Sequence, residues 1–473
     1  MLLKSFGLLG AASVFAWTFC TKVEEPAVAT RLSEVEGEPE AIYKQYCSGC
    51  HGEKVEMFVD RKWKYGNEKQ QLIQSITNGS LDYGMPAWKE VISAEEIDAL
   101  AGLIVEKLAT VNQYQFSSKP TSNVYEAASG SVRLDTVLTG LSSPWGIAQL
   151  PNGDLLVTDR AGTLHWVNRA GEKKIVSGTP QVVAEGQGGL LDVAIDPAFA
   201  KNGFIYLSYS KGKKEGNQTV ATTAIFKAKL ENGALINGKD IFVAEPWSRA
   251  RHHYGSRIVF DKAGFLYFSV GDRGNQAENP QSLASDAGKI HRIKSDGTIP
   301  ADNPFVKTAG ARPSIYSYGH RNPQGVYYHA GRNEIWAHEH GPRGGDEVNV
   351  VKKGKNYGWP VISYGINYDG KAFTNLTEKE GMEQPEIYWI PSIAPSGMTF
   401  VTSDKYPNWK GDLVAGSLRF KYLNRCIVKD GKIVGEEKLL PNSGRMRSVV
   451  MGQDGFMYIG VEDPGMVVRV VPL

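Results

Sequence analysis

The segment AGFLYFSVGD at residues 263–272 begins with a glycine turn and continues as a short strand of aromatic and aliphatic residues. The same pattern recurs as NGDLLVTDR from 152, NGFIYLSYS from 202, RNEIWAHEH from 332, KGDLVAGSL from 410 and DGFMYIGVED from 454. The six units start roughly 45–80 residues apart, and no long amphipathic helix is predicted between them. Six all-β units of this size predict a six-bladed β-propeller.

The two ends of this repeat region are expected to meet. Each blade of a propeller buries its faces against its neighbours, so the ring must close. The segment SVRLDTVLTG at 131–140 alternates like a strand and precedes the first repeat. It is predicted to join the last blade, which gives a propeller over residues 131–473. The loops of one face gather around the axis, and the functional site is expected there.

The N-terminus has the order of an export signal. An apolar run from Phe6 to Phe19 is too short to span a bilayer as a stable helix, and it ends at Cys20. Residues 1–20 are interpreted as a lipoprotein signal, with 21–35 as a linker and a lipid anchor on Cys20. The alternative is ordinary cleavage after Ala29. Either way the protein is expected outside the cytoplasm, in the periplasm of a bacterium.

Composition restricts the class of partner. The chain has 473 residues, with 53 Lys and Arg against 51 Asp and Glu. This balance gives no indication of a nucleic-acid partner. Of the four cysteines, Cys426 is left over once lipid and haem attachment are assigned, so no disulfide is required.

The stretch QYCSGCHGEK at 45–54 is a covalent haem attachment motif. Cys47 and Cys50 would form thioethers to the haem, and His51 would ligate the iron. A thioredoxin-like redox pair is the alternative, but the preceding EPEAIYKQY favours a helix rather than a strand. Met85, which is 34 residues after His51, is the predicted sixth ligand. Met57 competes, but it is too close to the motif to reach the opposite haem face.

A closing helix completes the haem unit. It is predicted to begin at Ser93, with Glu96 completing a capping box. Helix, haem motif, methionine loop and closing helix together resemble a small all-α class I cytochrome c over residues 36–110. Residues 111–130 are polar and aperiodic and are interpreted as a linker. Ligation by His and Met leaves no open iron site, so this unit is expected to transfer electrons.

Adjacent histidines stand in ARHHYGSRIVF at 250–260. Neighbours on a strand point to opposite faces, so at most one of His252 and His253 can face a shared pocket. The alternative is a purely structural histidine. Asp272 ends a predicted strand, and a carboxylate beside a histidine sets its tautomer and raises its basicity. The pair is therefore a candidate general base.

Arginines accumulate at the ends of the predicted strands. GHRNPQG contains Arg321 and Asn322, GSLRF contains Arg419, and GRMRSV contains Arg445 and Arg447. Any one of these arginines alone could be ordinary surface charge. Several guanidinium groups around one axis would bind a planar polycarboxylate well.

The stretch AHEHGPRGGDEVN at 337–349 contains the densest group of ligand-type side chains. His338 and His340 share a strand face and could ligate zinc. The glycines and the proline that follow them expose backbone carbonyls, and Asp346 and Glu347 add carboxylates. A ligand set rich in oxygen favours calcium.

Seven ordered motifs resemble one known family. GQGGLLDVAIDP, HHYGSR, GDRGNQ, GHRNPQG, EHGPRGGDE, GKNYGWP and RMRSV are similar to segments of the quinoprotein soluble sugar dehydrogenases, and most similar to their aldose branch. These enzymes bind pyrroloquinoline quinone (PQQ) on a six-bladed propeller. The resemblance covers about residues 131–473 of this chain.

The resemblance implies a role for each matching position. His253 matches the catalytic base and Asp272 its partner. The positions that match PQQ contacts are Gln187, Arg321, Asn322, Arg419, Arg445 and Arg447. Gly341 and Pro342 match carbonyl ligands of a catalytic calcium, and Glu347 and Tyr357 match ligands of a structural calcium. Three positions depart from the family pattern, because Arg419 replaces a common lysine, His252 replaces Asp or Asn, and His340 replaces the Gln of some members.

The implied reaction oxidises an aldose at its anomeric hydroxyl to the lactone, reduces PQQ, and passes electrons to the fused haem and on to a cytochrome or respiratory acceptor. The loops at 364–392 are expected to shape the sugar site. Two other functions remain open. A calcium-dependent propeller lactonase would not need the arginines or the haem, and a non-catalytic binding propeller would not need the histidine base.

Overall fold

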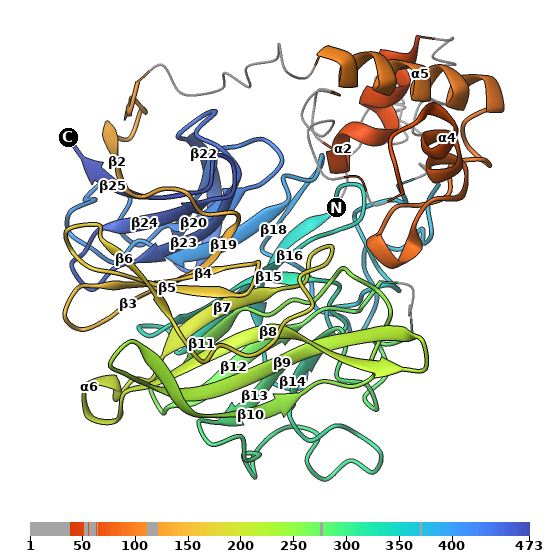
Figure 1. Ribbon diagram of the computed structural model, residues 1–473. Helices are drawn as coiled ribbons and strands as arrows, with labels where there is room; N and C mark the ends of the chain where they lie inside the picture. The colour runs from red at the N-terminus through yellow and green to blue at the C-terminus, as the bar shows by residue number, and fades with distance from the viewer. Residues whose placement is uncertain are drawn as a thin grey trace, which may run out of the picture.

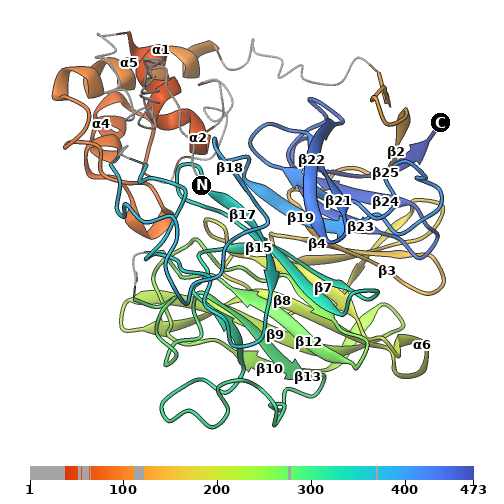
Figure 2. The same ribbon diagram turned by 180° about the vertical axis from the view of Figure 1, so that it is seen from behind.

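The computed structural model describes residues 38–51, 55, 63, 65–110, 122–274, 278–368 and 371–473. Figure 1 shows a small helical unit beside a large ring of sheets, and Figure 2 shows the same arrangement from behind. Cys20, Ala29 and Met57 lie outside the described residues, so the predictions made for them stay predictions. Among the described residues, no helix is both long and apolar enough to cross a membrane.

Six antiparallel sheets form the predicted six blades. The first is β3 (Pro144–Gln149), β4 (Leu155–Asp159), β5 (Thr163–Val167) and β6 (Lys173–Val176). The second is β7 (Leu190–Ile195), β8 (Phe204–Glu215), β9 (Gln218–Glu231) and β10 (Ala234–Val243), with α6 (Phe199–Asn202) between β7 and β8. The third is β11 (Ile258–Phe260), β12 (Phe265–Val270), β13 (Lys289–Lys294) and β14 (Ile315–Tyr318).

The remaining blades follow the same order from inside to outside. The fourth is β15 (Pro323–His329), β16 (Glu334–Glu339), β17 (Asp346–Val351) and β18 (Ile387–Trp389). The fifth is β19 (Pro395–Phe400), β20 (Leu413–Ser417), β21 (Leu423–Lys429) and β22 (Lys432–Leu439). The sixth is β23 (Met446–Met451), β24 (Met457–Val461) and β25 (Met466–Pro472), extended by β2 (Val132–Leu138) and β1 (Val124–Tyr125).

The ring closes as predicted. β2 pairs antiparallel with β25, with Val132 opposite Pro472 and Leu134 opposite Val470. The first strand of each blade contacts the first strand of the next around the whole ring, from β3 through β7, β11, β15, β19 and β23 back to β3. The hydrophobic cores lie between blades, where for example Trp336 of β16 packs with Phe400 of β19 and Leu413 of β20. Each blade therefore depends on its neighbours for burial.

The six sequence repeats correspond to the second strand of each blade, namely β4, β8, β12, β16, β20 and β24. Every residue of β4, β20 and β24 is buried, because these strands are covered on both faces by adjacent blades. This burial explains the continuous apolar character that identified them. Three of the inner strands, β3, β15 and β19, are less conspicuous in the sequence because they contain Gly and Pro, as in PWGIAQ and PQGVYYH.

The helical unit comprises α1 (Pro39–Ile42), the π-helical turn η1 (Tyr43–Cys47), α2 (Ser48–His51), α4 (Lys69–Asn78), the 3₁₀ turn η2 (Leu81–Tyr83) and α5 (Ala94–Thr110). The predicted capping box is confirmed, because Ser93 N donates to Glu96 Oε2 at 2.9 Å and Glu96 N donates to Ser93 Oγ at 3.2 Å. Ile97, Leu100 and Ile104 of α5 are buried in the core of this unit.

Candidate functional site

His253 lies in the loop between β10 and β11. Its φ of 55° is in the left-handed region. Arg273 fixes the conformation of this loop. Its guanidinium stacks 3.6 Å from the Tyr254 ring, and it also donates hydrogen bonds to the carbonyls of Ala250 and His252. The backbone therefore presents the His253 ring toward the end of β12, where Asp272 stands.

His253 and Asp272 form a directly bonded pair. His253 Nδ1 lies 2.6 Å from Asp272 Oδ1, and both side chains are buried. Trp359 Nε1 donates to Asp272 Oδ2 at 2.8 Å, and Gly274 N donates to Oδ1 at 2.7 Å. With Asp272 as a carboxylate, Nδ1 carries the proton and Nε2 keeps its lone pair. Burial, reinforced by the Arg321 charge, lowers the pKa of His253 to about 4, so the ring is neutral at pH 7.

Gln187 and Asn322 fix the backbone of the same loop. Gln187 Oε1 accepts from His253 N at 2.9 Å, and Asn322 Oδ1 accepts from Gly255 N at 3.1 Å. Asn322 Nδ2 is buried and has no partner among the described residues. A buried amide donor without a partner is costly, so this group fits an acceptor on a bound ligand.

Arg445 and Arg447 meet at the start of the inner strand β23. Arg445 Nε and Arg447 Nε both donate to the Glu462 carboxylate, at 3.2 and 2.7 Å. Burial alone would raise the pKa of Glu462, but the two guanidinium groups outweigh burial and hold it well below its ordinary value. Because two cations share one carboxylate, the cluster keeps a positive excess that suits an anionic ligand.

Arg321 and Arg419 stand on two other blades. Arg321 Nη1 donates to Gly341 O at 2.8 Å, and its guanidinium lies 5.2 Å from the Trp359 ring. Arg419 Nη1 donates to Ser392 O at 3.3 Å, and its guanidinium lies 4.8 Å from the Phe420 ring. Arg321 is thus placed next to the predicted base.

The predicted calcium positions follow β16. A Cβ on Gly341 would lie 2.2 Å from Gly344 O, so only glycine fits there. Gly341 N donates to Asp346 Oδ1 at 2.9 Å, which holds the turn that contains Pro342. The carbonyl of Gly341 accepts from Arg321 and keeps a second lone pair for a cation.

Glu347 has the electrostatics of a cation ligand. It is the register partner of Glu339 across β16 and β17, so two carboxylates share one side of the ladder. Burial, with repulsion from Glu339, raises the pKa of Glu347 to about 8. The Tyr357 hydroxyl donates to Val350 O at 2.7 Å, and the side chain packs inward. The backbone carbonyl of Tyr357 is therefore the group that could ligate a calcium ion.

The histidines of β16 do not assemble a zinc site in the part of the chain that the structure describes. No group of three or more His, Cys, Asp or Glu side chains converges there on a common point. His340 Nε2 lies 2.7 Å from Pro395 O, and His338 is fully buried against Gly325. Both histidines are therefore placed as packing residues beside the axis.

The predicted haem-binding positions lie in the helical unit. Cys47 ends η1 and His51 ends α2, one helical turn further on. Cys47 and Met85 are both half-buried against the same hydrophobic core. Met85 closes a turn in which Ser80 N donates to Met85 O at 2.8 Å and Met85 N donates to Ser80 O at 3.1 Å. The side chain of Cys50 lies outside the described residues.

Two residues of this site were not identified from the sequence. Trp359 reaches Asp272 from 87 positions away, and Glu462 holds the arginine pair. A usable signal existed for Glu462, because several repeats end in an acidic residue at the site end of the second strand. These residues are Asp159, Asp272, Glu339 and Glu462.

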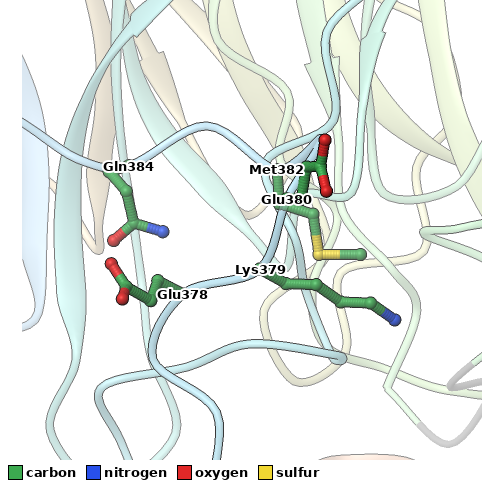
Figure 3. A pocket seen from close by; sticks show the side chains of 5 residues that line it. All are labelled: Glu378, Lys379, Glu380, Met382 and Gln384. Carbon is green, nitrogen blue, oxygen red and sulfur yellow. The ribbon is translucent and has the colours of Figure 1, made fainter.

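A surface pocket lies apart from these residues. Figure 3 shows its lining by Glu378, Lys379, Glu380, Met382 and Gln384. None of the predicted site residues lines it. It belongs to the long segment between β17 and β18, which was expected to shape the sugar site.

Comparisons with known proteins agree with this geometry. The model of the family "Glucose / Sorbosone dehydrogenase" matches residues 141–469, and that of "Cytochrome C oxidase, cbb3-type, subunit III" matches residues 36–104. Aldose sugar dehydrogenase YliI of Escherichia coli K12 is 40% identical over 359 residues, covering 74% of this chain and 96% of the relative.

Solved structures resemble the propeller. The apo-form of soluble aldose sugar dehydrogenase from Escherichia coli has a TM-score of 0.69 and 38% identity, covering 72% of this chain and 100% of that one. The PQQ-bound aldose sugar dehydrogenase of Streptomyces coelicolor has a TM-score of 0.60 and 28% identity, covering 73% of this chain and 99% of that one. The predicted resemblance is confirmed: the chain belongs to the glucose/sorbosone dehydrogenase family and carries a cytochrome c-type domain at its N-terminus.

Proposed function

We propose that this chain is a PQQ- and calcium-dependent aldose dehydrogenase that oxidises the anomeric carbon to the lactone and delivers the electrons to its own c-type haem. The observation that carries the proposal is the buried His253–Asp272 pair beside Arg321 and the Arg445–Arg447 cluster. A PQQ-bound relative with the same propeller fold supports it. A lactonase would not require the cationic cluster, and a binding propeller would not require the histidine base.

Each side chain has a distinct task. His253 Nε2 takes the proton of the anomeric hydroxyl, while Nδ1–H stays bonded to Asp272. Asp272 keeps the tautomer and stabilises the imidazolium, and Trp359 keeps Asp272 in place. Gln187 holds the backbone amide of His253, so the ring direction does not depend on substrate.

The residues present fit the implied cofactors. Arg321, Arg419, Arg445, Arg447 and the Asn322 amide would hold the carboxylates and carbonyls of PQQ. Gly341 and Pro342 carbonyls would hold the catalytic Ca²⁺, and Glu347 with the Tyr357 carbonyl would hold the structural one. Cys47, Cys50, His51 and Met85 would hold the haem. When bound, PQQ with Ca²⁺ accepts the hydride of the sugar, and haem c accepts single electrons.

The export signal proposed for residues 1–20 fits this chemistry, because haem attachment through two cysteines and sugar capture would both occur outside the cytoplasm. Lipid on Cys20 would keep the enzyme at the membrane, near an external electron acceptor. The tether of the haem to the propeller would raise its local concentration to about the millimolar range.

The test is reconstitution with a haem readout. The haem-loaded protein free of PQQ is mixed with PQQ and Ca²⁺, aldoses are supplied one by one, and the haem absorbance is followed. We expect haem reduction with at least one aldose, and reduction about 10³-fold slower with His253→Ala. Reduction that is equal in His253→Ala, or absent in the unmodified chain with every aldose, would contradict the proposal.

A further inference from the structure

The turn that ends at Met85 touches the propeller next to the proposed base. Gly84 has a φ of 80°, and a Cβ built on it would lie 3.5 Å from Cγ of His252. The His252 ring meets the His253 ring edge to face, with centroids 4.6 Å apart and planes at 88°. A single side chain therefore separates the methionine turn of the haem unit from the base.

The His252 ring is held in a fixed place. A Cβ on Gly274 would lie 1.9 Å from His252 Nε2, so the absence of a side chain at Gly274 makes room for the ring. Arg273 donates to the carbonyl of His252 and is itself almost fully buried. The ring thus lies between a glycine of the haem unit and a glycine of the propeller.

A hydrogen bond joins the same two surfaces. The Tyr83 hydroxyl donates to Glu185 Oε2 at 2.7 Å, and Arg251 Nε donates to the same oxygen at 3.1 Å. Arg251 is buried and also donates to Thr219 O at 2.6 Å. A buried arginine therefore orients the carboxylate that receives the tyrosine, and this reduces the entropy lost on contact.

A third contact comes from the long segment between β17 and β18. Tyr368 packs against the hydrophobic core of the haem unit. Both views place the haem unit beside the side of the ring that carries β16, β17 and β18 (Figures 1 and 2). Three separate segments of the propeller, at 185, 252 and 368, therefore meet the haem unit.

We infer that residues 80–86 form a docking loop for electron transfer, and that His252 is the positioning residue that holds this loop against the catalytic site. The inference rests on the proposed function and deepens it, because the acceptor is docked in one place rather than freely tethered. Electron tunnelling falls steeply with distance, so a docked methionine edge shortens the path. The inference also assigns a role to His252, at a position where the family usually has Asp or Asn.

The number of electrons that each aldose releases determines how often the haem must be reduced and reoxidised. Each aldose that becomes a lactone loses two electrons and two protons. A ferric haem takes one electron at a time, so each turnover needs two haem reductions and two reoxidations by an external one-electron oxidant. Both protons leave to water. The docked unit must therefore keep a haem edge open to that oxidant while the loop stays in place.

The first test needs no PQQ. Amide hydrogen exchange is measured on the full-length, haem-loaded protein for peptides covering 80–86 and 183–187. Loss of a hydrogen bond to a carboxylate weakens docking by about tenfold, so Tyr83→Phe should exchange faster there by about that factor. His252→Asn, which removes the ring that contacts Gly84, should do the same.

Tyr328→Phe is the matched control, because it removes a surface hydroxyl whose partner is Asn333 at 2.8 Å, within one propeller hairpin. Its exchange at 80–86 should equal that of the unmodified protein. Equal exchange in all four proteins would overturn the docking inference. This outcome is independent of sugar oxidation, since no PQQ is present.

The second test compares two electron acceptors in the protein reconstituted with PQQ and Ca²⁺. Tyr83→Phe should slow haem reduction by about tenfold while a small diffusible dye is reduced at the unmodified rate. An unchanged haem rate, or an equal loss with both acceptors, would contradict the role of the loop. No sugar oxidation with dye in the unmodified protein would instead refute the proposed function and leave the exchange result standing.

Discussion

The propeller and the haem unit position their functional side chains in different ways. In the propeller, His253, Asp272 and Trp359 form one hydrogen-bonded chain, and they come from three separate loops fixed by the ring. In the haem unit, Cys47, His51 and Met85 lie on four- or five-residue helices and a turn around one small core. The comparison teaches that hydrogen bonds within the polypeptide position the side chains of the propeller site. The side chains of the haem unit are expected to depend more on the attached haem for their positions.

The largest effect expected from this comparison is at the base. His253→Ala should lower the rate of sugar oxidation by about 10³-fold, because general-base catalysis contributes about 10²–10⁴-fold. The haem absorbance spectrum should not change, since His253 does not contact the haem unit's core. Stopped-flow reduction with an aldose measures the rate. A change in the haem absorbance spectrum of His253→Ala would show that the substitution also affects the haem unit.

The second prediction concerns stability. Leu100 of α5 and Leu156 of β4 are both fully buried, and Leu→Ala at either should cost about 3 kcal/mol locally. We would measure thermal unfolding of the full chain by calorimetry and record the haem absorbance in parallel. Leu100→Ala should lower only the midpoint temperature of the transition in which the haem absorbance changes. Leu156→Ala should lower only the transition of the propeller. One shared shift in both variants would mean that docking couples the two units into one cooperative block.

The third prediction tests the orientation of Asp272. Trp359→Phe keeps the aromatic packing under Arg321 but removes the 2.8 Å hydrogen bond to Asp272. The turnover number should fall by about tenfold, as for other bonds to a charged acceptor. The aldose KM should change little, since Trp359 acts through Asp272. A loss confined to KM would place Trp359 against the sugar instead.

The smallest expected effect is in the pH profile. Burial and Arg321 lower the pKa of His253 to about 4, so the base stays neutral and active above that pH and is lost as the pH falls through it. In Trp359→Phe the Asp272 carboxylate loses a donor and pairs more strongly with imidazolium, which raises the His253 pKa. The acid limb of the rate profile should therefore move upward, by less than about one pH unit. An acid limb that moves to lower pH would contradict the claim that loss of the Trp359 hydrogen bond strengthens the pairing of Asp272 with His253.

Much of the propeller could be predicted from the sequence, because strands buried on both faces must be apolar throughout. This constraint marked β4, β12 and β24 and led to the correct number of blades. It could not identify the inner strands β3, β15 and β19, in which glycine and proline interrupt the apolar run. That residues 131–140 join the last blade was predictable because the ring must close, whereas their pairing with β25 in particular was not.

The pairing of His253 with Asp272 was predictable because the stretch with the two histidines precedes one strand and Asp272 follows the next, and antiparallel neighbours bring these two points to the same end of a blade. Trp359 was not, since a tryptophan in GKNYGWP has no local sign that its indole nitrogen serves a carboxylate in another blade. The contact of Gly84 with His252 was equally hidden, because nothing in either segment specifies how two domains face each other. Long-range partners of this kind depend on the assembled ring.

The pairing of β2 with β25 has a consequence for biogenesis. The sheet that closes the ring also carries Arg445 and Arg447, with Glu462 directly after β24. Its innermost and outermost strands come from opposite ends of the propeller sequence. Until β2 pairs with β25, the ring is therefore open, and the blade that contains β23 and the Arg445–Arg447 cluster lacks its outer strand.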